Sequence, residues 1–280
     1  MSTQIAGDHA ALRAATTSDV GLCTITHIEG SFSRRLGAQL AVHPDGTVTG
    51  SLADGCLEQE LAREVAMGGK RRVIRYGAGS PKIDFRLPCG GGLDILIDPD
   101  PDRHACRAAV DRLDKREEVR LALPEPSPLA HRRYIPELRL ALFGEGPELA
   151  AMAQVARAAG IAVESRGRED GSLALGQAPD RLTADRWTAI VLLFHDHEWE
   201  RAILQWALTT PAFLIGAQGG APARAARKAQ LRALGFAPEQ IERIASPIGT
   251  VIHSREPLAL ALSALAGIAG QYELRHPHHA

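Results

Sequence analysis

The 280-residue chain has few cysteines, few aromatic residues and almost no net charge, and these shortages exclude several classes of protein. Its four cysteines show no Cys-x-x-Cys spacing, so we expect reduced thiols rather than a disulfide framework or a zinc motif. A net charge of −1 gives no electrostatic reason to bind nucleic acid or an anionic membrane. No apolar run approaches the roughly 20 residues that span a bilayer, and residues 1–18 lack the apolar segment of a secretory signal. We therefore expect a cytoplasmic protein.

The length favours two domains, because 280 residues exceed a typical single-domain core and 45% of them are hydrophobic. Residues 123–136 contain four prolines, which disfavour a continuous helix or a central strand and predict a semi-extended linker. A charged helix is expected just before it, over residues 102–120. This divides the chain into a first domain at 1–122 and a second at 137–280.

The strongest local signal in the first domain surrounds one thiol. Residues 40–49 have the pattern of two strands joined by a Pro-Asp-Gly turn, and residues 57–67 have helical apolar spacing. Cys56 therefore lies between a glycine loop and a helix start, where unpaired N–H groups and the helix dipole favour the thiolate. Such a sulfur suits a metal, a cofactor or covalent chemistry. A small buried hydrophobe is the other interpretation of a free cysteine, and position alone leaves both open.

The second domain alternates strands and helices. An apolar strand at 138–143, a Gly144-Glu-Gly146 turn, a helix at 149–159 and a strand from Ile161 form a partial dinucleotide fingerprint. This pattern predicts a Rossmann-like parallel sheet. We expect NAD to bind weakly or not at all, because Leu149 replaces the third glycine and Ser165-Arg-Gly-Arg168 stands where a ribose-binding carboxylate belongs. The two arginines either bind the extra phosphate of NADP or are solvated surface charges, and we favour the second.

Two later strands also end in polar or glycine-rich segments. His195-Asp-His197 follows an apolar strand at 187–194, and Gly219-Gly220 follows another at 212–216 and precedes a basic helix. Because the carboxyl ends of parallel strands border the ligand crevice, these segments are candidates for binding, the glycine turn through its N–H groups. His195 and His197 point to opposite sides of an extended chain and make poor joint metal ligands, and we expect Asp196 to cap the next helix.

Three blocks of sequence resemble the XdhC/CoxI family. They are Gly30-Ser31…Arg34-Arg35-Leu-Gly37-Ala38 with Asp45-Gly46…Gly50-Ser51 and Gly55-Cys56-Leu-Glu58; Pro88-Cys89-Gly90-Gly91-Gly92…Pro99; and Pro247-Ile-Gly249…Glu256-Pro257…Ala261. Their order and spacing, between about Asp19 and Ile268, are specific to that family. The chain departs from it at Pro147, where the family usually has histidine, and at the Arg166 turn, where it usually has aspartate.

The resemblance implies an accessory protein for molybdenum hydroxylases such as xanthine dehydrogenase. Such a protein binds the molybdenum cofactor in its molybdopterin form, keeps it ready for sulfuration by a separate cysteine desulfurase, and passes it to the hydroxylase apoenzyme. It is expected to be a homodimer. The implied fold is an XdhC/CoxI-type α/β domain followed by a Rossmann-like domain.

The resemblance also implies a set of cofactor-binding residues. Soft sulfur from Cys56 and Cys89 lies on glycine-lined backbone, where a planar pterin can approach closely, and Cys56 is the candidate molybdenum contact. Arg34 and Arg35 can bind phosphate or molybdate oxygens, although without the resemblance a solvated loop would be the preferred interpretation. The remaining candidates are Gly55, Gly90, Gly144, Gly146, His195, His197 and Gly219.

No Ser-His-Asp set, pair of catalytic carboxylates or metal triad is evident in the sequence, so we expect a cofactor-binding chaperone rather than an enzyme. The alternative is an NADP-dependent oxidoreductase that uses the second domain. A third class is a scaffold that binds the apoenzyme and no ligand.

Overall fold

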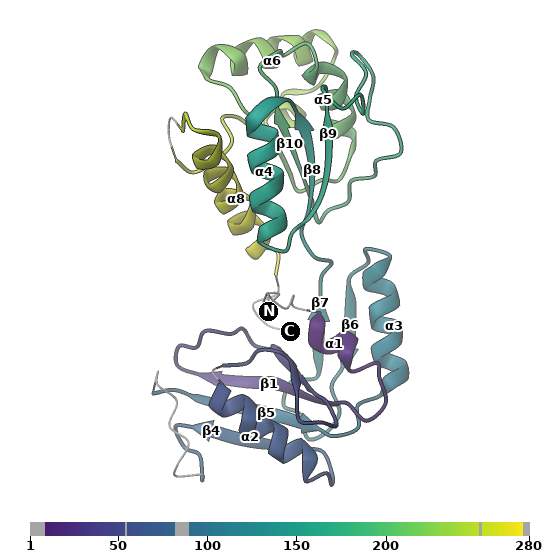
Figure 1. The fold of residues 1–280 in the computed structure, drawn as a ribbon, viewed down its shortest axis with the longest axis vertical. Coiled ribbons are helices and arrows are strands. Elements are labelled where there is room, and N and C mark those ends of the chain that lie inside the picture. Colours follow the sequence, from purple (N-terminus) through teal and green to yellow (C-terminus); the bar gives the residue numbers. More distant parts are fainter. Residues whose placement is uncertain (1–8, 54, 82–89, 252–253, 277–280) are drawn as a thin grey trace. The chain divides into compact units, whose positions relative to one another are not determined.

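The computed structural model describes residues 9–53, 55–81, 90–251 and 254–276 (Figure 1). The chain divides into two compact units, the first reaching Pro136 and the second spanning Glu137–His276. Each unit is described by itself. None of the helices in the described part of the chain has the length and apolar character that a bilayer crossing requires.

The first unit is built on a five-stranded antiparallel sheet with the order β3-β2-β1-β5-β4. Its strands are β1 Gly21–Glu29, β2 Gln39–Val42, β3 Val48–Gly50, β4 Arg72–Gly77 and β5 Gly92–Asp98, and its helices are α1 Ala10–Ala14, α2 Gly55–Ala66 and α3 Arg103–Asp114. The expected strand-turn-strand at 40–49 is the β2–β3 hairpin.

Both faces of this sheet are covered, which explains why β1 is buried along most of its length. Successive side chains of a strand point to opposite faces. Cys23 and Ile25 accordingly pack with Leu57 and Leu61 of α2, whereas Leu22 packs with α1 and α3 on the other side. One face of α2 packs against the sheet, so the residues of its first turn that lie on the opposite face remain outside the core.

The segment expected to be a proline-rich linker is instead part of a hairpin. β6 Val119–Ala122 pairs with β7 His131–Tyr134, antiparallel, and both strands contribute buried residues to the first unit. The prediction of a semi-extended linker over 123–136 was wrong for residues 131–134. Proline lacks the N–H that a strand ladder needs, but three of the four prolines lie in the hairpin loop and Pro136 follows the second strand, so none interrupts the pairing. The helix expected at 102–120 ends at Asp114.

The second unit is a five-stranded parallel sheet with the order β12-β11-β10-β8-β9, as the Rossmann-like pattern predicts. Its strands are β8 Arg139–Gly144, β9 Ala162–Gly167, β10 Thr188–Leu193, β11 Leu214–Ala217 and β12 Ile244–Ala245; its helices are α4 Gly146–Ala158, α5 Glu200–Thr209, α6 Ala221–Ala233, α7 Pro238–Ile241 and α8 Pro257–Glu273.

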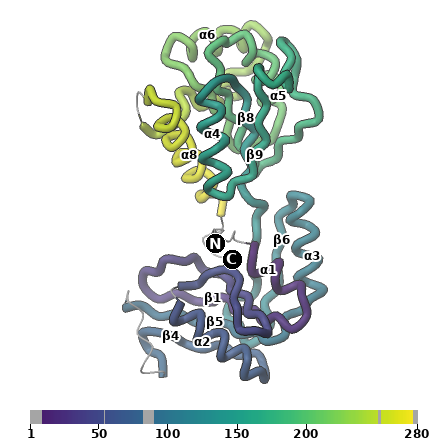
Figure 2. Tube along the Cα trace, in the orientation of Figure 1, coloured from purple at the N-terminus to yellow at the C-terminus, as the bar shows by residue number. Residues whose placement is uncertain are grey.

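Helices cover this parallel sheet on both faces. Side chains of α5, α6 and α7 form one core cluster with alternate residues of β8 and β10. On the other face α4 and α8 lie side by side, as Figures 1 and 2 show. Every residue of the central strand β10 is buried, as expected for a strand covered on both faces.

The strand order places a crevice at one point of the sheet edge. From β8 the chain crosses to β9 on one side and then to β10 on the other. In such doubly wound sheets ligands bind outside the carboxyl ends of the strands where the order reverses, here between β8 and β10.

Candidate functional site

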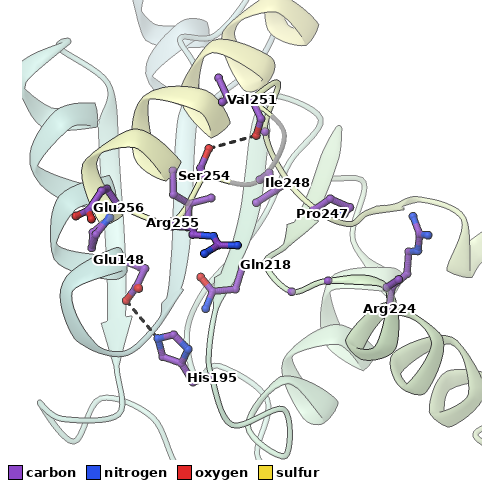
Figure 3. Close-up of a pocket in the computed structure, with 16 residues that line it drawn as sticks. Glu148, His195, Gln218, Arg224, Pro247, Ile248, Val251, Ser254, Arg255 and Glu256 are labelled. Atoms are coloured by element: carbon purple, nitrogen blue, oxygen red, sulfur yellow. Dashed lines mark hydrogen bonds and ion pairs between the residues drawn. The ribbon is translucent and has the colours of Figure 1, made fainter.

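A cavity of about 560 Å³ lies at the carboxyl ends of β10 and β11 in the second unit (Figure 3). Its wall comes from five segments: the first turn of α4, His195 after β10, the turn from Gln218 into α6, residues 247–249, and the start of α8. Within the described ranges, no group of three or more His, Cys, Asp or Glu side chains is arranged to hold a metal ion. A concave site of this size that is lined by a few polar and charged side chains is a candidate ligand site.

The backbone conformation of the turn before α6 requires glycine. Gly219 has φ +116, and a Cβ there would lie 2.9 Å from the Cβ of Ala223. Gly220 is the N-cap residue of α6 and has no side chain to occupy the first N–H groups of the helix. The expected anion-binding turn thus leads directly into the cavity.

A buried ion pair anchors this part of the wall. The Arg227 and Glu200 side chains are 5% and 2% exposed, and Arg227 Nη2 lies 2.8 Å from Glu200 Oε2. The same guanidinium donates to Ser246 Oγ at 2.9 Å and to the Gln218 carbonyl at 3.0 Å. Arg227 therefore ties α6 to two other segments, the end of β11 and the loop that begins at Ser246.

The two histidines after β10 face different hollows. His195 Nε2 lies 3.4 Å from Glu148 Oε2 and lines the 560 Å³ cavity. His197 Nδ1 lies 3.2 Å from Glu200 Oε1 and faces a separate depression beside Arg227. The two rings do not form a joint site, as the alternation along the chain predicts. The expectation that Asp196 caps the next helix was wrong, because α5 starts at Glu200 with Trp199 as N-cap and the Asp196 side chain accepts the Glu198 N–H instead.

The start of α4 is closed by a carboxylate of the chain itself. Glu145 Oε1 accepts the backbone N–H of His195 at 3.1 Å, and Glu145 Oε2 lies 3.3 Å from Arg168 Nη1. This side chain lies between the ends of β8 and β10, where a dinucleotide pyrophosphate lies in Rossmann folds. Glu148 adds a second negative charge in the first turn of α4. An incoming pyrophosphate would have to displace one carboxylate and approach another.

The predicted arginine pair after the second strand is arranged differently from the expectation. β9 is longer than the sequence suggests, because its register with β8 continues to the Gly144↔Gly167 pair. Arg166 therefore lies inside the strand, 2.9 Å from Glu164 Oε1, and Arg168 pairs with Glu145.

Carboxylates do follow the end of β9, contrary to the sequence expectation. Glu169 and Asp170 lie after the strand and border an open depression of about 350 Å³ that also includes Gly146. Asp170 accepts the N–H and the hydroxyl of Ser172, and these hydrogen bonds lower its pKa. Neither Arg166 nor Arg168 is unpaired, which argues against an NADP phosphate site there.

The candidate glycines of the second unit do not act alike. Gly219 lines the 560 Å³ cavity with His195. Gly144 is buried between β8 and β10, where a Cβ would lie 2.4 Å from the Leu193 carbonyl oxygen, so strand packing requires it. Gly146 borders the other depression. The sequence interpretation therefore identified one wall of the cavity and missed Glu148, Gln218 and Arg255; the last of these immediately precedes the Glu256-Pro257 block that the interpretation did single out.

In the first unit, Cys56 is exposed in the first turn of α2. This position excludes the interpretation of Cys56 as a small buried hydrophobe. Cys23 and Cys106 are buried, and burial raises the pKa of their thiols to about 12 and about 11. Cys56 is thus the accessible thiol among the three cysteines that the structure describes, and Cys89 lies outside the described residues.

Parts of the first two sequence blocks lie close together in the first unit. Arg34 donates through Nε to the Ser51 carbonyl at 3.2 Å and through Nη2 to Ser51 Oγ at 3.0 Å, which fixes it to the loop before α2. A Cβ on Gly30 would lie 3.6 Å from the Gly91 Cα. Gly90, next to it, has φ +69. Arg35 is half-buried.

These features define a class: a two-unit α/β protein with an accessible thiol beside glycine turns and a Rossmann-like unit that holds a strand-end cavity. The model of the XdhC and CoxI family matches residues 14–77, and that of the XdhC Rossmann domain matches residues 140–268. The chain belongs to the XdhC/CoxI family.

Two known proteins are similar over most of the chain. The molybdenum cofactor insertion chaperone PaoD of Escherichia coli (strain K12) is 33% identical over 267 residues, which cover 89% of this chain and 82% of PaoD. A crystal structure titled as a xanthine dehydrogenase (BH1974) from Bacillus halodurans superposes with a TM-score of 0.74 at 20% identity, covering 96% of each chain. At that identity the second comparison supports the fold alone.

Proposed function

We propose that this protein is an accessory protein that binds the molybdenum cofactor as cargo and inserts it into a molybdenum hydroxylase apoenzyme of the xanthine dehydrogenase type. The relationship to PaoD supports the general role. The structural observation that carries the proposal is the exposed Cys56 in the first turn of α2.

The surroundings of Cys56 suit a bulky cofactor with a soft metal centre. Thiolate sulfur is a ligand for soft metal ions, and the first turn of a helix stabilises its negative charge. A Cβ on the neighbouring Gly55 would meet no described atom within 4 Å, so the backbone directly before Cys56 borders open space. Arg34, fixed through Ser51, supplies a cation at the loop that leads to α2.

The finer parts of the proposal rest on the family resemblance. They are that the cofactor is bound in its molybdopterin form, that Cys89 and Gly90 contribute with Cys56, that a separate cysteine desulfurase supplies the sulfur, and that the carrier is a cytoplasmic homodimer. Sulfuration adds a soft sulfur ligand to the metal of the cofactor. An accessible thiol is compatible with this step, because a site that accommodates soft sulfur also suits the sulfur-modified cofactor.

The test is anaerobic purification of the full chain from cells that make the cofactor, followed by molybdenum and pterin analysis and by activation of a molybdenum hydroxylase apoenzyme. We expect both molybdenum and pterin in the wild-type protein. Cys56→Ser should retain at least tenfold less, because the soft ligand is lost while the size is kept.

Cys106→Ala is the matched control, because this thiol is buried and should not contact the cargo. Equal retention by Cys56→Ser and the wild type, with both proteins folded, would remove Cys56 from the site. A wild-type protein free of molybdenum and pterin, and unable to activate the apoenzyme, would refute the function.

A further inference from the structure

The wall of the 560 Å³ cavity includes the side-chain amide of Gln218, whose orientation is fixed. Gln218 Nε2 donates to the Phe194 carbonyl at 3.2 Å, so the amide oxygen must be the other atom of the group. That oxygen is shielded from solvent and has no hydrogen-bond partner among the described residues. Figure 3 shows it on the side of the cavity where Arg255 lies. A buried acceptor without a partner costs free energy, which a ligand N–H would recover.

A carboxylate lies on the same side of the cavity. The Glu148 side chain is only 16% exposed, and its nearest described polar partner is His195 Nε2 at 3.4 Å. Both oxygens of a carboxylate can accept, so Glu148 retains capacity for two parallel N–H donors. Gln218 and Glu148 together make one wall that accepts hydrogen bonds.

The cavity also contains hydrogen-bond donors. Arg255 forms no hydrogen bond or ion pair with the part of the chain that the structure describes, and Figure 3 shows its guanidinium directed toward the centre of the cavity. The N-termini of α6 and α8 border the same space, and neither N-cap residue makes a side-chain cap hydrogen bond. An unpaired guanidinium together with free helix N–H groups is a site for a phosphate.

We propose that this cavity binds a heterocycle with a 2-amino-4-oxo pyrimidine edge that carries a phosphate. Such an edge presents an N–H and an amino group side by side, which matches the Glu148 carboxylate, and Gln218 Oε1 takes a further donor. The phosphate lies against Arg255 and the start of α6. The volume falls within the range of about 300–1,000 Å³ for small-molecule sites.

Two kinds of molecule have this chemistry. One is a guanine nucleotide, and the other is a phosphorylated pterin, whose pyrimidine ring has the same edge. The assignment to a pterin rests on the proposed function, because the cargo there is a pterin phosphate.

The experiment is calorimetric titration of the full chain with air-stable probes. These are guanosine 5′-monophosphate (GMP), inosine 5′-monophosphate (IMP), guanosine, inorganic phosphate and 6-hydroxymethylpterin monophosphate. IMP lacks only the amino group of GMP. We expect GMP to bind about tenfold more tightly than IMP, the change expected for one charge-assisted hydrogen bond, and also more tightly than guanosine or phosphate.

Two substitutions test the acceptor Glu148 and the donor Arg255 separately. Glu148→Gln should bring the affinity for GMP down to that for IMP, whereas Arg255→Ala should lower GMP affinity about tenfold and leave guanosine affinity unchanged. The controls are Glu239→Gln and Arg232→Ala, which remove matching charges from exposed positions outside the cavity. Unchanged thermal unfolding shows that each variant is folded.

The outcomes are distinct. Tighter binding of the pterin phosphate than of GMP assigns the cavity to the cargo, and the reverse assigns it to a nucleotide. Failure of both probes, or equal affinities for GMP and IMP in the wild type, overturns the proposal. If the cavity fails while the purified protein still carries molybdenum, the carrier function stands without this site. If a probe binds while no molybdenum is retained, the carrier function fails and the cavity stands.

Discussion

Two helices of the same parallel sheet, α4 and α6, begin in contrasting ways. At α4 the chain supplies its own anion, because Glu145 accepts the His195 N–H and pairs with Arg168. At α6 the turn is glycine, and two cations, Arg224 and Arg255, border an open cavity. The position that a Rossmann fold offers to a dinucleotide is thus closed, and a neighbouring position is open. The fold supplies both helix ends, and single side chains determine which one can take a ligand.

The largest effect is expected where the open helix is anchored. Arg227→Ala removes the guanidinium that pairs with the buried Glu200 carboxylate, together with its bonds to Gln218 and Ser246. We expect a loss of about 3–5 kcal/mol in the free energy of unfolding, measured by chemical denaturation, and weaker GMP binding. A loss below about 1 kcal/mol would show that α6 keeps its place without the ion pair.

The next effect tests the glycine turn itself. Gly219→Ala forces a side chain into φ +116 and against Ala223, so we expect a stability loss of about 1–3 kcal/mol together with weaker probe binding. Gly220→Ala is the matched control, because φ there is −77 and the nearest contact of a Cβ would be Pro222 Cδ at 3.8 Å. Equal thermal stability of the two variants would contradict the required backbone conformation.

A third substitution should make the start of α4 available to a ligand. Glu145→Ala removes the internal anion and frees the His195 N–H. The wild-type protein should bind NAD weakly or not at all, and the variant should bind it about tenfold more tightly, as measured by calorimetric titration. Glu169→Ala is the control for the loss of a nearby charge. Tight NAD binding by the wild type would show that Glu145 does not close the crevice.

The smallest effect is expected for the cation at the closed helix. The Arg168 side chain is 47% exposed, pairs with Glu145 at 3.3 Å and lies 5.3 Å from the centre of the Trp199 ring. Because solvent screens such a pair, Arg168→Ala should cost at most about 1 kcal/mol of unfolding free energy in chemical denaturation. A loss as large as that of Arg227→Ala would make the two ion pairs equivalent and remove the contrast between the helices.

The sequence predicted the parts of the fold that depend on local pattern. The apolar runs of β8 and β10, the Gly144-Glu-Gly146 turn and the glycine turn before α6 all have a local signal, and the structure has them where expected. The glycine loop and the helix start around Cys56 also have a local signal, but that signal left open whether the thiol is accessible or buried, and the structure shows it exposed.

The parts that were missed depend on distant partners. The length of β9 is set by its register with β8, although residues 164–167 contain no apolar side chain that would predict a strand. Glu145 closes the crevice through a backbone N–H 50 residues away. Glu148, Gln218 and Arg255 converge because the ends of β8, β10 and β11 and the starts of α4, α6 and α8 meet at one sheet edge. No local period encodes that convergence.

The β6–β7 hairpin determines where the protein can be divided. A fragment that stops at residue 122 would keep β6 and lose β7, so the backbone edge of β6 would lose its partner strand and the core cluster that contains Leu121 would lose Tyr134. Unpaired strand edges recruit other chains, and such a fragment should aggregate. A fragment that continues through Pro136 keeps both strands. Expression vectors, gene fusions and protease sites for separating the two units should therefore use the Pro136–Glu137 junction.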